Sequence, residues 1–141
     1  GPREFVMSQL LKLSKPFPSR FIEQKGTSFK ADYVSHSTVT EFLLGILGSY
    51  SFEHVSWMKG QSGLEGGVFR LTAEVDGKTV VIEEVGSIGD RRTDSAGEKA
   101  KDIASDAIKR CAMRLGLGLH LWSQNNYVLH DILSKKTGES E

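Results

Sequence analysis

The chain has 141 residues, with 18 basic and 18 acidic side chains, so its formal net charge is zero. This length, with 38% hydrophobic and 26% charged residues, fits one soluble globular domain spanning residues 1–141. Cys111 is the only cysteine, which excludes an intrachain disulfide and a cysteine-based zinc site, and no apolar run approaches the roughly 20 residues that span a membrane.

The N-terminal third predicts short elements and one clear helix. Residues 6–14 are apolar enough for one or two helical turns, which the prolines at 16 and 18 end. Gly26 indicates a turn, and residues 29–34 a short strand. Thr38 and Glu41 have the spacing of a capping box. A helix up to Gly48 is then expected from apolar residues at helical spacing, namely Val39, Phe42, Leu43, Ile46 and Leu47.

Three strands and a long helix follow. The strands are predicted at residues 52–58, 68–75 and 78–85, and Asp76-Gly77 indicates a tight hairpin between the last two. After a polar loop, residues 97–115 carry an apolar helical stripe that includes several alanines, so the helix backbone can lie close to what it packs on. Residues 119–122 are apolar, and residues 127–133 predict a final short helix. This order predicts an α+β fold, in which a curved antiparallel sheet packs on one long helix with short helices flanking it.

Basic side chains gather in three places. Lys109, Arg110 and Arg114 lie on the long helix, and together they could bind phosphates. The alternative is a solvated face on which Asp106 pairs with Lys109 or Arg110. Arg91 and Arg92 lie in the loop before this helix and could form a second phosphate clamp. The N-terminal third interleaves basic and aromatic residues, a combination that suits single strands: Arg20, Phe21, Lys25, Phe29, Lys30 and Tyr33.

Little in the sequence indicates an enzyme. Gly77-Lys78-Thr79 ends like a phosphate-binding loop, but that loop needs a glycine at position 72, where this chain has threonine, and a helix where a strand is predicted. The four histidines have no paired metal spacing. Glu83 and Glu84 are neighbours on a strand, so they point to opposite faces and cannot act on one atom together. We therefore expect no catalysis, no metal and no cofactor.

The stretch from Glu98 to Trp122 resembles the DNA-binding helix of the Rad-fifty-two superfamily of single-strand annealing proteins. Eukaryotic members carry a pattern close to A-x-T-D-x-L-K-R-A-L-R-x-F-G, and this chain has SDAIKRCAMRLG at residues 105–116. The ending Gly116-Leu117-Gly118, followed by Leu121-Trp122, is more similar to the phage, Sak-type branch. The resemblance extends over residues 18–122, through Ser19-Arg20, Lys30, the helix to Gly48, Trp57 and the strands around Asp76-Gly77.

The resemblance implies ATP-independent annealing of complementary DNA strands in homologous recombination and repair. It implies a homo-oligomer, with a ring favoured, that holds single-stranded DNA and the annealing duplex intermediate in a positively charged groove. Arg20, Lys109, Arg110 and Arg114 would line that groove, with Lys30 and Tyr33 beside it and Arg91 and Arg92 in the adjoining loop. A protein that coats single-stranded DNA is a candidate partner. The expected location is the cytoplasm of a bacterial host for a phage protein, or the nucleus or an organelle for a eukaryotic one.

Two departures from the family qualify this interpretation. The family's outer DNA site uses a lysine immediately before the hairpin Asp-Gly, where this chain has Val75, and Lys78 follows the turn instead. The long C-terminal tail of eukaryotic members has no counterpart here, which favours a phage or bacterial member. The alternative function is a non-catalytic adaptor that loads a recombinase, or another protein-interaction module.

Overall fold

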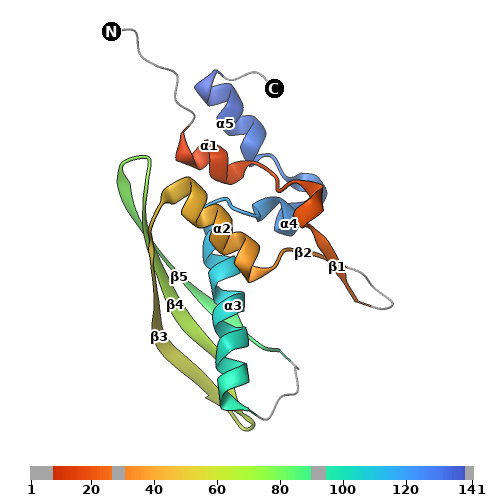
Figure 1. Ribbon diagram of the computed structural model, residues 1–141, viewed down its shortest axis with the longest axis vertical. Coiled ribbons are helices and arrows are strands. Elements are labelled where there is room, and N and C mark those ends of the chain that lie inside the picture. Colours follow the sequence, from red (N-terminus) through yellow and green to blue (C-terminus); the bar gives the residue numbers. More distant parts are fainter. Residues whose placement is uncertain (1–7, 27–30, 90–94, 139–141) are drawn as a thin grey trace.

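A computed structural model describes residues 8–26, 31–89 and 95–138. The predicted α+β fold is confirmed, with an antiparallel three-stranded sheet packed against one long helix and short helices gathered at one end (Figure 1). None of the described helices is long and apolar enough to cross a membrane. The elements in chain order are α1 Gln9–Ser14, η1 Ser19–Phe21, β1 Glu23–Lys25, β2 Ala31–Tyr33, α2 His36–Leu47, β3 Ser51–Gly60, β4 Gly63–Val75, β5 Lys78–Ser87, α3 Ala96–Arg114, α4 Leu119–Ser123, η2 Gln124–Asn126 and α5 Leu129–Thr137.

The sheet has the order β3-β4-β5, with all neighbours antiparallel. Asp76 and Gly77 form the tight turn that the sequence predicts, with φ values of 50° and 81°, and Val75 pairs with Lys78 across it. On β4 the alternate residues Phe69, Leu71, Ala73 and Val75 are buried. These side chains face α3, so the sheet has one packed face and one exposed face.

Helix α3 crosses the sheet at very short range. It begins after Ser95, whose Oγ accepts a hydrogen bond from the Glu98 amide at 3.3 Å, as an N-cap serine does. At Gly86 of β5, an added Cβ would lie only 2.2 Å from the Ile103 carbonyl oxygen and 2.9 Å from the Ala107 Cβ. The expectation from the alanine-rich stripe is therefore confirmed, because small residues on both elements allow the backbones to meet.

The short elements cover the end of the sheet where the β4–β5 turn lies. Helices α2 and α3 enclose the main core with β4, around Leu43, Leu71 and Cys111, all of them fully buried. The turn itself is bonded to α1. The Asp76 carboxylate accepts hydrogen bonds from the Gln9 and Leu10 amides at 2.7 and 3.2 Å, and the Gln9 side chain accepts one from the Asp76 amide at 2.7 Å.

Several predicted boundaries need correction. The capping residue of α2 is Ser35, whose Oγ accepts from the Thr38 amide, so the helix begins at His36 rather than after Thr38. Strands β3, β4 and β5 are longer than predicted because antiparallel pairing continues through the polar residues and glycines next to each apolar run. The last helix begins at Leu129, later than predicted, because residues 124–126 form a separate 3₁₀ turn.

Candidate nucleic-acid interface

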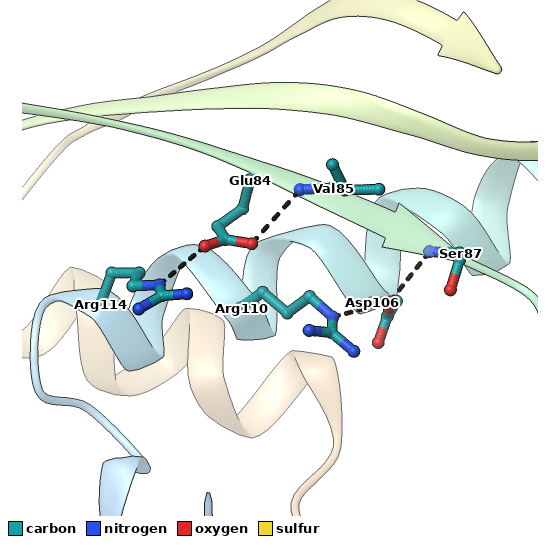
Figure 2. Close-up of polar contacts among 6 residues, drawn as sticks. All are labelled: Glu84, Val85, Ser87, Asp106, Arg110 and Arg114. Carbon is teal, nitrogen blue, oxygen red and sulfur yellow. Dashed lines mark hydrogen bonds and ion pairs between the residues drawn. The ribbon is translucent and has the colours of Figure 1, made fainter.

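Arg110 and Arg114, both predicted as DNA-binding cations, form ion pairs along the edge of α3 against β5. Arg110 Nε lies 3.2 Å from Asp106 Oδ2 on the same helix, and Arg114 Nε lies 2.7 Å from Glu84 Oε2 on β5 (Figure 2). The Asp106 carboxylate also accepts a hydrogen bond from the Ser87 amide at 2.9 Å. The Asp106–Arg110 pair that the sequence offered as an alternative is thus present, and the Glu84–Arg114 pair was not anticipated.

Each ion pair uses only one of the N–H donors of its guanidinium. The recorded contact is through Nε in both arginines, whereas a guanidinium carries five N–H donors. The Arg114 side chain is 58% exposed and that of Arg110 36% exposed. The carboxylates therefore orient the two side chains at the surface while leaving donor capacity on each, although they also reduce the local positive charge.

Two lysine ammonium groups lie within cation–π distance of the Tyr33 ring. The Lys25 Nζ is 4.1 Å from the centre of the Tyr33 ring, and the Lys109 Nζ is 4.9 Å from it. Strand β1 pairs with β2, with Lys25 opposite Ala31 and Glu23 opposite Tyr33, which brings Lys25 to this ring. The contacts join β1, β2 and α3 into one basic and aromatic surface. Cation–π attraction of this kind is worth about 0.5–1 kcal/mol at exposed sites.

Trp122 forms a second cation–π contact, with Arg110. The Arg110 guanidinium carbon lies 4.9 Å from the Trp122 ring centre, so Arg110 contacts both Asp106 and this indole. Trp122 is on α4 and is 48% exposed.

A tight turn from Gly116 to Gly118 brings α4 back against α3. The backbone φ of Gly118 is 76°, and a Cβ added at Gly118 would lie only 3.1 Å from Phe17 Cε2, so glycine is required there. We name the five residues Lys25, Tyr33, Lys109, Arg110 and Trp122 the basic–aromatic surface.

The other predicted site residues have different positions. Arg20 is held over the Phe21 ring, with its guanidinium carbon 4.7 Å from the ring centre, and none of its recorded contacts reaches the basic–aromatic surface in the described part of the chain. Lys30, Arg91 and Arg92 lie outside the described residues. Trp122 belongs to the surface but was not predicted to bind DNA, and Lys25 was predicted only as one of the basic residues of the N-terminal third. The hairpin that positions Lys25 has only three residues per strand, and Trp122 approaches Arg110 through a turn, so neither contact has a periodic signature.

Two pockets adjoin Tyr33 and Lys109. The first, about 210 Å³, lies between β2, α3 and α4, and its lining includes Phe17, Asp32, Leu121 and Trp122. The second, about 230 Å³, is polar and its lining includes Lys25, Ser35, Asp102 and Asp106. Tyr33 and Lys109 line both of them. A third, larger pocket of about 510 Å³ lies at the β4–β5 turn, where Val75, Lys78 and Arg114 line it with several leucines.

His120, Cys111 and Glu83 have structural surroundings rather than those of a reactive site. His120 Nε2 accepts a hydrogen bond from the Phe17 amide at 3.1 Å, and burial lowers the pKa of this histidine. Burial, with a smaller contribution from the Glu84 charge, raises the pKa of the Cys111 thiol to about 11, so the thiol is protonated and unreactive at neutral pH. Glu83 pairs with Arg70 on the face of the sheet opposite Glu84, as strand alternation predicts. Within residues 8–26, 31–89 and 95–138, no group of three or more His, Cys, Asp or Glu side chains could hold a metal ion.

Val75 is part of the core and is 8% exposed. It cannot serve as the cation of the family's outer DNA site, and Lys78, across the turn, lines the apolar pocket instead. No family model matches the chain, and no curated protein matches it either. The resemblance to the Rad-fifty-two superfamily therefore remains a prediction from the sequence motifs.

Proposed function

We propose that this protein binds single-stranded DNA and anneals complementary strands without ATP, as a homo-oligomer. The observation that carries the proposal is the set of cation–ring contacts on one surface, in which Lys25 and Lys109 contact the half-buried Tyr33 and Arg110 contacts the exposed Trp122. Proteins that bind single strands combine cations along the backbone with aromatic rings on which bases stack. Both kinds of group are present here within contact distance of one another.

The ion pairs on α3 are compatible with phosphate binding. Each guanidinium has N–H donors besides the Nε that contacts its carboxylate, so a phosphate can bind to them while the ion pair remains. Arg110 and Arg114 are one helical turn apart, a spacing that can follow a phosphate backbone. The neutral net charge of the chain limits long-range attraction of DNA, so binding depends on this local surface and on having several subunits.

The proposed annealing takes its free energy from base pairing. The protein would hold a strand extended, so that a complementary strand can test its bases, and no covalent bond changes. A nucleotide site is therefore unnecessary. The Gly77-Lys78-Thr79 stretch that resembled a phosphate-binding loop is the turn and start of β5, with a strand where such a loop requires a helix.

The experiment is annealing of complementary oligonucleotides, followed by fluorescence transfer between labelled strands, with and without ATP. We expect acceleration over the spontaneous rate that is the same in both conditions. Light scattering on the same samples should show an assembly larger than a monomer. Acceleration only with ATP would contradict the proposed mechanism, and no acceleration with no strand binding would contradict the function itself.

The alternative function is a recombinase-loading adaptor or another protein-interaction module. It is favoured by the apolar pocket at the β4–β5 turn, whose lining by Leu10, Val80 and Leu129 suits a protein segment better than a nucleotide. The annealing experiment separates the two. An adaptor requires its partner and leaves naked oligonucleotides to anneal at their spontaneous rate.

A further inference from the structure

The pocket of about 210 Å³ beside Tyr33 has the chemistry of a site for one nucleobase. The residues that line it include three aromatic ones, Phe17, Tyr33 and Trp122, together with Asp32 and Lys109. Pockets that hold drug-sized ligands run to roughly 300–1,000 Å³, so this one suits a single planar heterocycle. Rings accept a base by stacking, and a carboxylate can only accept hydrogen bonds at neutral pH, so it selects among bases by their donors.

We infer that this pocket receives one base of the bound strand and that Asp32 favours a base carrying an exocyclic amino group. The inference rests on the proposed function and adds a base-dependent contact to the phosphate contacts of α3. Asp32 Oδ1 already accepts a hydrogen bond from the Gln24 side chain at 3.2 Å, which orients the carboxylate on the exposed β1–β2 hairpin. A carboxylate accepts from the N4 amino group of cytosine, whereas the O4 carbonyl of uracil or thymine presents an acceptor to it.

The basic–aromatic surface supplies the rest of a nucleotide site. Lys109 lines the pocket and contacts Tyr33, and Arg110 contacts Trp122 at the pocket wall. The cations that would bind phosphate thus contact the same two rings that would stack on a base. This arrangement distinguishes the pocket from the larger one at the β4–β5 turn, where none of the lining residues within the described part of the chain is aromatic.

The test compares oligo-dC with oligo-dU of equal length, because cytosine and uracil differ at the group that Asp32 would read. We expect the protein to bind oligo-dC at least about fivefold more tightly. Asp32→Asn should bring the ratio of the two affinities close to one, because an amide both donates and accepts. Glu23→Gln is the matched control, since Glu23 is an exposed acid on the neighbouring strand that does not line the pocket, and it should keep the ratio.

Tryptophan fluorescence gives a second readout, from a residue that lines the pocket. In Trp57→Phe protein, Trp122 is the remaining tryptophan, and its emission should change when oligo-dC binds. If both oligonucleotides bind equally tightly and Asp32→Asn changes neither ratio nor emission, the base pocket is refuted while strand binding stands. If neither oligonucleotide binds, the proposed function fails first.

Discussion

At the scale of single residues, substitutions at Arg110 of α3 can distinguish a DNA-binding surface from a helix edge that only contacts solvent. Arg110 contacts Asp106 and Trp122, and its side chain is 36% exposed. Arg70 is a close counterpart on the opposite face of the sheet, since it pairs with Glu83 and its side chain is 38% exposed. The two arginines have similar exposure and similar ion pairs, so they differ mainly in which surface they occupy.

We predict that Arg110→Ala weakens binding of single-stranded DNA about equally for all sequences and lowers the slope of log affinity against log salt by about 0.7, the value for one phosphate contact. Arg70→Ala should change neither quantity. Titration of labelled oligo-dT at several salt concentrations measures both. Equal behaviour of the two variants would show that α3 makes no phosphate contact, and dissociation of the Arg110 variant into monomers would assign this residue to assembly instead.

At the scale of elements, the sequence predicted what depends on local pattern and failed where contacts join distant segments. The stripe of α3 and the Asp76-Gly77 turn were correct because periodicity and turn chemistry are local properties. The Glu84–Arg114 pair joins residues 30 positions apart, and the Arg110–Trp122 contact depends on the turn between α3 and α4. The spacing on the helix did predict Asp106 as a partner of Arg110. No spacing in one sequence encodes the other two contacts, so Glu84 and Trp122 were not foreseen as partners.

The crossing of α3 over β5 gives a prediction at this scale. In Gly86→Ala the new Cβ would lie 2.2 Å from the Ile103 carbonyl oxygen, so helix and strand must separate. We expect a loss of about 1–3 kcal/mol in the free energy of unfolding, the usual cost of overpacking. The matched variant is Gly45→Ala in α2, where no atom of the described residues outside the helix turn lies within 4 Å of the new Cβ.

Gly45→Ala should raise the free energy of unfolding by about 0.5–1 kcal/mol, because alanine favours a helix interior over glycine. Urea unfolding of both variants, followed by circular dichroism, measures the two changes. A Gly86→Ala protein as stable as the wild type would mean that α3 does not pack this closely on β5 in solution.

At the scale of the whole molecule, the first and last parts of the chain are joined by a few polar contacts. Helices α1 and α5 lie side by side (Figure 1). The Tyr127 hydroxyl donates a hydrogen bond to the Ser14 carbonyl, and the Ser14 hydroxyl lies 3.1 Å from His130 Nδ1. His120 adds the contact to the Phe17 amide. These polar contacts add to the apolar packing of Leu13 and Phe17 that holds the N-terminal segment in the main core.

The His120 contact makes the stability of the molecule depend on pH. Its Nε2 accepts from the Phe17 amide, so this nitrogen must be without a proton, and burial lowers the pKa below the usual value of 6.5, against the opposing effect of the Asp32 charge. A group whose pKa is lower in the folded state stabilises the fold above its unfolded pKa. That stabilisation is lost as the pH falls from about 6.5 through the folded value, because the unfolded chain then binds the proton more readily.

We predict that the free energy of unfolding falls more between about pH 7.5 and pH 5 in the wild type than in His120→Gln. The extra loss should be at most about 1.4 kcal/mol for each unit by which the pKa of His120 differs between the folded and unfolded states. Glutamine can still accept a hydrogen bond but does not titrate in this range, and the other three histidines are present in both proteins, so their effects cancel in the comparison. Urea unfolding at both pH values gives the two differences. If the two differences are equal, protonation of His120 does not oppose folding, and the prediction is wrong.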